Sequence, residues 1–192
     1  MPAVKRLLLA LLLLGCEPSP TADDAGPPGG DAATSDAGDQ RRVEIGGGAS
    51  EFLPYAEDAV VGVVRGPQGG GRTGGYHIWV GARTVGFRAD QRIAYRWTLR
   101  LDGSAAAVCD AVPRGPECFS AVDRTFKPQP TSAGHVVFGQ AAILEDCCRV
   151  VGQPIRVELS VTDADGARGS ASLRVRASDL CPDPVTNANL CP

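Results

Sequence analysis

The chain has 192 residues, of which 43% are hydrophobic, 21% charged and 5% aromatic, and its formal net charge is −3. Its 24 glycines and 15 prolines together make up about a fifth of the chain, which is below the roughly 25 to 30% typical of low-complexity chains. A folded domain is therefore expected. Two histidines and one methionine leave few ligands for a haem pocket or a multi-histidine metal centre. The mildly acidic balance argues against a nucleic-acid partner and against an anionic membrane surface as a partner.

The first 15 residues predict a secretory signal peptide. Lys5 and Arg6 precede an apolar run over residues 7–14, which would extend only about 12 Å as a helix and is too short to span a bilayer. A basic start followed by a short apolar stretch is the layout of a cleaved signal. The run ends Leu13-Leu14-Gly15-Cys16, which resembles the lipobox of bacterial lipoproteins.

This resemblance implies that Cys16 is the mature N-terminus and carries a diacylglyceryl group. Each acyl methylene buried in a bilayer contributes roughly 0.8 kcal/mol of binding free energy, so two or three acyl chains hold a protein on a membrane permanently. Glu17 in place of Asp implies export to the outer membrane by the sorting rule of enteric bacteria, with the protein periplasmic or exposed at the cell surface. The alternative is an ordinary cleaved signal, with Cys16 incidental or paired in a disulfide.

Residues 16–42 are predicted to be the lipidated cysteine followed by a tether. Between Glu17 and Gln40 there are six acids but no Lys, no Arg and no large apolar side chain, so burial cannot offset the entropy of ordering. A flexible chain of this length has an r.m.s. span of roughly 25 to 30 Å, and its acids repel anionic headgroups.

Residues 43–192 are predicted to form an all-β domain, an antiparallel immunoglobulin-like β-sandwich with disulfide-bonded loops. Apolar and polar residues alternate along residues 93–101, and again on both sides of the turn Asp163-Ala164-Asp165-Gly166. No segment shows a sustained helical period, although residues 140–148 are compatible with a short helix. The strands are expected at residues 60–65, 76–87, 93–101, 122–127, 135–144, 155–163 and 171–175.

The closing hairpin, residues 157–175, resembles the last two strands of immunoglobulin-like, fibronectin III and PKD-type bacterial modules. Trp97 lies on a strand where such folds often bury a tryptophan. True immunoglobulin domains carry a cysteine before that residue, and residues 43–96 contain none. The resemblance therefore concerns architecture and covers about half of the domain.

Six cysteines remain once Cys16 is set aside. An even number in an exported protein predicts three disulfides, and alternating strand directions place all six at one end of the sandwich. We expect Cys181 to pair with Cys191, and Cys147 and Cys148 to take separate partners, because a bond between neighbours closes a strained ring. A zinc site is the alternative, but it lacks Cys-x-x-Cys spacing. The six are Cys109, Cys118, Cys147, Cys148, Cys181 and Cys191.

The glycine-rich segment 66–75 is expected to be a loop at the same end. Residues 69–74 match Gly-x-Gly-x-x-Gly but precede a predicted strand, whereas a dinucleotide loop must open a helix. Arg65-Gly66-Pro67-Gln68-Gly69-Gly70 with Tyr76-His77-Ile78-Trp79-Val80 resembles a motif of uncharacterised lipoproteins from predatory and soil-dwelling Gram-negative bacteria, a family without an assigned activity. The resemblance implies a candidate ligand surface at Gln68, His77 and Trp79.

The remaining chemistry is sparse, so we expect no catalytic residue, metal or cofactor, and a binding or structural role rather than an enzyme. The alternative is a metal-binding or hydrolytic domain centred on His77, with His135 nearby. Asp163, Asp165 and Gly166 are typical of a turn, since no Glu completes a calcium loop. No Gly-x-Ser-x-Gly elbow is present. The expected partners are the membrane, through the lipid, and an unidentified protein or glycan.

Overall fold

The computed structural model describes residues 41–66, 75–181 and 188–191. All of them belong to the second of the two units into which the chain divides, residues 37–192. The predicted signal peptide and Cys16 lie outside the described residues, as does the predicted tether up to residue 40. No described residue lies in a helix that is long and apolar enough to cross a membrane. The elements are β1 (Arg42–Gly47), β2 (Leu53–Pro54), β3 (Ala59–Val61), β4 (Val64–Arg65), β5 (Tyr76–Val85), β6 (Ile93–Leu101), the 3-10 helix η1 (Ala106–Cys109), β7 (Cys118–Phe126), β8 (Gln129–Thr131), β9 (Gly134–Leu144), the 3-10 helix η2 (Cys147–Arg149), β10 (Pro154–Thr162) and β11 (Arg168–Ala177).

One sheet has the strand order β3-β11-β10-β6-β7. Neighbouring strands in this sheet are antiparallel, except that β3 and β11 run parallel to each other. Along β6 the predicted alternation holds: Ile93, Tyr95, Trp97 and Leu99 are buried, as a strand with one face against a core requires. The hairpin β10–β11 closes through the turn that the sequence predicts, with Thr162 opposite Arg168.

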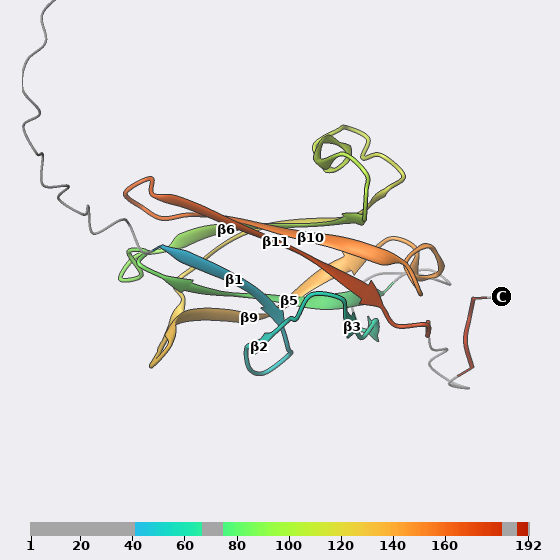
Figure 1. Cartoon of the computed structure of the whole chain (residues 1–192), viewed down its shortest axis with the longest axis horizontal. Coiled ribbons are helices and arrows are strands. Elements are labelled where there is room, and N and C mark those ends of the chain that lie inside the picture. Colours follow the sequence, from blue (N-terminus) through green and yellow to red (C-terminus); the bar gives the residue numbers. More distant parts are fainter. Residues whose placement is uncertain (1–40, 67–74, 182–187, 192) are drawn as a thin grey trace, which may run out of the picture. The chain divides into compact units, whose positions relative to one another are not determined.

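The second sheet has the order β2-β1-β5-β9-β8, with β4 also paired to β5. Its inner face includes Ile78, Val80 and Ala82 of β5, all of them fully buried. In Figure 1, β1, β5 and β9 form one layer and β6, β10 and β11 the other. The prediction of an all-β domain built as an antiparallel sandwich of two sheets is confirmed.

The core lies between the two sheets and includes Trp97, which has no exposed surface. The indole Nε1 of Trp97 donates to the backbone oxygen of Gly81 in the opposite sheet, with an N–O distance of 3.4 Å. The Tyr95 ring stacks on the indole at a centroid distance of 5.4 Å. A tryptophan on this strand is therefore buried, as the resemblance to immunoglobulin-like modules implies.

Two predicted elements are wrong in detail. Residues 60–65 were expected as one strand, but β3 belongs to one sheet and β4 to the other, so the chain crosses between the layers at Gly62 and Val63. Residues 140–148 were compatible with a short helix, yet residues 140–144 extend β9 and pair with β5. Only Cys147–Arg149 is helical, as a single 3-10 turn.

Candidate binding surface at the disulfide-linked end

All six cysteines lie at one end of the sandwich, which we call the disulfide end. It is the end where β6, β9 and β11 finish and where β5, β7 and β10 begin. The strand register defines it, because Ile155 lies opposite both Leu101 and Val175, and Tyr76 opposite Leu144. The clustering that alternating strand directions predict is therefore confirmed.

The first disulfide, Cys109–Cys118, closes the loop between β6 and β7. Within that loop the Gly115 amide donates to the Val108 carbonyl at 2.8 Å. Its Asp110 carboxylate lies 2.5 Å from the guanidinium of Arg96 on β6. Figure 1 shows this loop, in yellow-green, standing out from the sheets. A covalent bond, a backbone hydrogen bond and an ion pair thus hold a projecting loop in place.

The other two disulfides join the C-terminal segment to η2, and the expected Cys181–Cys191 pairing is wrong. Cys147 bonds to Cys181, and Cys148 bonds to Cys191. The neighbouring cysteines do take separate partners, as expected. The Asp146 carboxylate accepts the Cys148 amide at 2.9 Å and caps the turn that directs the two sulfurs to different partners.

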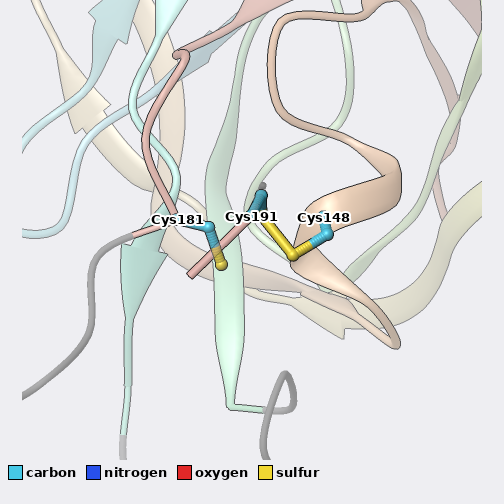
Figure 2. A group of neighbouring side chains, drawn as sticks. All are labelled: Cys148, Cys181 and Cys191. Atoms are coloured by element: carbon cyan, nitrogen blue, oxygen red, sulfur yellow. A yellow bond between two sulfur atoms is a disulfide. The ribbon is translucent and has the colours of Figure 1, made fainter. Parts of the chain in front are cut away.

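The two tail cysteines lie close together even though they are not bonded to each other. The Asn189 side-chain oxygen accepts the amides of both Cys181 and Cys191. Figure 2 shows the Cys181 sulfur beside the Cys148–Cys191 bond, and the three sulfurs lie within 4.8 Å of one another. Among the described residues this is the one group of three or more potential metal ligands. Sulfurs bonded to one another offer no thiolate to a metal ion, so this geometry favours covalent cross-links over the zinc alternative.

The glycine-rich loop leaves and re-enters the fold at the disulfide end. Arg65 of β4 pairs with Tyr76 of β5, and the Gly66 amide donates to the Gly75 carbonyl at 2.6 Å. Gln68, with the rest of residues 67–74, lies outside the described residues. The placement of the two loop bases agrees with the expectation from strand parity.

His77 is buried, which contradicts its assignment to an open ligand surface. It is 2% exposed, and neither ring nitrogen has a hydrogen-bond partner. Its ring contacts Trp79 edge-on at a centroid distance of 4.3 Å, and the pairing register places it between Val64 and Ile143. Burial lowers the pKa of His77. Of the three candidate residues, only Trp79 reaches the surface within the described part of the chain.

The pairing of His77 with His135 is also wrong. His77 lies opposite Ile143 near the end of β9, whereas His135 lies opposite Thr84 near its start. A strand rises about 3.3 Å per residue, so the separation along β9 is roughly 25 Å. No metal ion or catalytic base pair can use both rings.

Trp79 is held from the backbone side by a residue that sequence reasoning missed. The Tyr55 hydroxyl donates to the Trp79 carbonyl at 2.5 Å. Burial raises the pKa of Tyr55 to about 12, so the hydroxyl keeps its proton at neutral pH. Gly47 makes room for this contact, since a Cβ there would lie 2.0 Å from the Tyr55 hydroxyl oxygen.

Exposed apolar side chains at the disulfide end were also missed. Val112, in the loop closed by Cys109–Cys118, is 98% exposed. Leu180 follows β11, and Val60 lies on β3 at the same end; both are largely exposed. The available signal was the pair of cysteines flanking a Pro- and Gly-containing segment, which indicates a rigid surface loop. The exposure of a single valine in a loop is not predicted by any periodic pattern in the sequence.

The outer face of the sheet containing β6 is polar, as the arginines on that strand predict. Arg100 pairs with Glu158 at 2.7 Å, and Arg156 pairs with Asp102 at 2.8 Å. Arg100, with Thr98 and Arg156, lowers the pKa of Glu158, chiefly through the Arg100 hydrogen bond. These ion pairs satisfy the face internally, so the exposed apolar residues of the loops are the stronger candidates for a partner.

No protein-family model matches the chain, and no curated protein matches it.

Proposed function

We propose that this chain is a lipid-anchored protein of the bacterial outer membrane, as the lipobox-like sequence and Glu17 imply, and that its disulfide end binds a partner protein. The proposal has two parts. One is the location of the protein in the cell, which we call its address, and the other is the surface that binds the partner. They rest on different observations and are tested separately.

The address is supported by the sequence Leu13-Leu14-Gly15-Cys16 and by the use of cysteine. The six cysteines of residues 43–192 are all bonded in pairs. Disulfides persist in oxidising compartments and are rare in the bacterial cytosol. Three buried or half-buried cross-links therefore favour export, and the lipobox-like sequence favours attachment to a membrane through Cys16.

The single observation that carries the binding surface is the exposure of Val112 on a loop held in place by Cys109–Cys118. An apolar side chain on a mobile loop has little consequence, but one on a restrained loop presents a surface that loses little entropy on binding. Its branched methyl groups suit a protein pocket better than a glycan, because sugar recognition relies on polar and aromatic side chains. A protein is therefore the preferred partner.

The address is tested by the mass of the membrane-extracted protein. We expect the mature chain to begin at Cys16 and to carry the added mass of the acyl chains. Cys16→Ser should leave the chain unmodified and release it from the membrane fraction. An unmodified Cys16, or a mature terminus elsewhere, would overturn the anchor.

The surface is tested with a photo-crosslinking amino acid placed at Val112 in the full-length protein in cells. Ala164, in the exposed turn between β10 and β11 at the opposite end, is the matched control position. We expect a discrete protein adduct from position 112 only, and its loss when Cys109 and Cys118 are both changed to Ala. Equal labelling from both positions, or an adduct with glycan alone, would contradict a protein partner at the disulfide end.

A further inference from the structure

The opposite end of the sandwich, which we call the tether end, contains a cavity lined by arginines. It is the end where β1 and β6 begin and where β5 and β10 finish. The cavity has a volume of about 670 Å³ and lies between the start of β1, the end of β5 and Ser170 of β11. Arg41, Arg42 and Arg83 line it, together with a single acid, Glu44.

Arg83 is fixed in this cavity by two contacts. Its Nη1 lies 2.7 Å from the Glu44 carboxylate, and its guanidinium carbon lies 4.7 Å from the centroid of the Phe52 ring. Its Nε is shielded from solvent and has no hydrogen-bond partner. A guanidinium held in this way keeps donor capacity unused and is already oriented, so little order is lost when an anion binds.

The cavity lies within a wider region of positive charge. Most acids at this end are already engaged: Asp90 and Asp165 pair with Arg88, and the Asp163 carboxylate accepts three backbone amides. Among the described residues, no carboxylate is paired with Arg42, Arg92, Arg124, Lys127 or Arg168. The tether end therefore carries an excess of cationic groups.

The disulfide end has the opposite balance. Its loops carry the acids Asp102, Asp110, Glu117, Glu145, Asp146 and Asp179 against the basic residues Arg114 and Arg149, with Arg65 at the end of β4. The two ends of one sandwich thus differ in the sign of their charge. The net charge of −3 of the whole chain, which argues against an anionic membrane, therefore does not describe the tether end. In the field of a negatively charged surface such a domain turns its basic end toward the charge.

We propose that the arginine-lined cavity and the basic residues around it bind the phosphate groups of anionic phospholipids. The choice of a lipid rests on the proposed function, because a lipid on Cys16 would bring a membrane within the span of the predicted tether, which ends at Arg42. Guanidinium groups match phosphate oxygens in pairs, and basic side chains near an anionic membrane surface each add to the attraction. Bound in this way, the domain directs its disulfide end away from the membrane.

The test uses the chain from residue 16 onward with Cys16→Ser, so that binding does not depend on the anchor. Sedimentation with vesicles of phosphatidylcholine and phosphatidylglycerol is compared with sedimentation with phosphatidylcholine alone. We expect binding to the anionic vesicles only, weakened as salt rises above about 0.1 M, where the Debye length is about 10 Å. Arg41→Gln with Arg42→Gln should weaken it roughly 30-fold, about fivefold for each charge.

The control variant is Arg114→Gln with Arg149→Gln, which removes the same charge from exposed positions at the disulfide end. It should bind as the parent chain does, and circular dichroism checks that both variants fold. Equal losses in the two variants, or no binding at low salt, would overturn the proposal. Binding of inorganic phosphate or of poly-glutamate without binding of vesicles would also overturn it, in favour of a soluble anion or an acidic peptide. Each failure would leave the Cys16 anchor unaffected.

Discussion

The two ends of the sandwich are stabilised by different means. At the disulfide end three covalent bonds hold the loops and the C-terminal segment. At the tether end the turns rest on hydrogen bonds, of which the clearest are those to Asp163. Its carboxylate accepts the Arg88 amide with one oxygen and the amides of Asp165 and Ala167 with the other, and the side chain is buried.

This difference matches the kinds of loop at each end. The tether end has short connections, such as residues 163–167 and 86–92, which one acid can satisfy. The disulfide end has the long connection between β6 and β7 and the tail that follows β11, the last strand. Long segments lose more entropy on ordering than local hydrogen bonds return, and cross-links reduce that loss by restricting the unfolded chain. We therefore expect the loss of a disulfide to act on the disulfide end and the protonation of Asp163 to act on the tether end.

The largest expected effect is the loss of a long-range disulfide. In a background where Cys148 and Cys191 are already Ala, so that no second bond shortens the loop, replacing Cys147 and Cys181 with Ala opens a loop with a sequence separation of 34, whereas replacing Cys109 and Cys118 opens one of 9. The chain-entropy relation gives losses of about 3.8 and about 2.6 kcal/mol, respectively. Urea unfolding of the two double variants measures the difference. A larger loss from the shorter loop would mean that native contacts, rather than loop length, set the contribution of these bonds.

The next effect is acid sensitivity at the tether end. Hydrogen bonds from backbone amides, first that of Arg88, lower the pKa of Asp163 below its usual 3.8. Its contribution to stability is therefore complete above that value and is lost as the pH falls below it, through the lower pKa of the folded state. Asp163→Ala should lower the unfolding midpoint at pH 7 and reduce the fall in stability between about pH 4 and pH 2. Asp163→Asn keeps one acceptor oxygen, so its unfolding midpoint at pH 7 should lie between those of the parent chain and of Asp163→Ala. An unchanged acid profile in Asp163→Ala would assign the sensitivity to other acids.

The smallest effect is a pH response near neutrality at the disulfide end. Burial lowers the pKa of His77 below 6.5, so the unfolded chain binds a proton more readily than the folded one. Stability is therefore full above pH 6.5 and declines as the pH falls below it. His77→Leu should remove part of the decline between about pH 7.5 and pH 5.5, as followed by thermal unfolding. His135→Gln is the control, and a larger change in that variant would point to the other histidine.

The sequence predicted the elements whose side chains alternate. β6 and β10 were located nearly residue by residue because each has one face against the core and one in water. β1 was not among the expected strands, and Gly46 and Gly47 leave its second half without an alternating pattern. In the fold, Gly46 is required by close approach, since a Cβ there would lie 2.3 Å from the Leu53 carbonyl oxygen. Residues that bring two backbones together leave no hydrophobic pattern.

The cysteine pairing was predictable only in part. Strand parity located the cluster, and ring strain separated Cys147 from Cys148. The partners of Cys181 and Cys191 depended on Asn189, whose side chain folds the tail back so that both cysteines reach η2. His77 was misplaced for a similar reason. The position of a residue on a strand does not reveal which neighbours cover its side chain. His77 is covered by Trp79 and by the strands that pair on either side of it.

The pair of bonds from η2 to the tail has a practical consequence for handling the protein. Any cut of the backbone between Cys181 and Cys191 leaves the two pieces joined through the Cys148–Cys191 bond. A nicked molecule would therefore migrate with the intact one and differ from it by a single added water. Only chemical reduction would release the small C-terminal peptide, so the integrity of purified samples has to be judged after reduction.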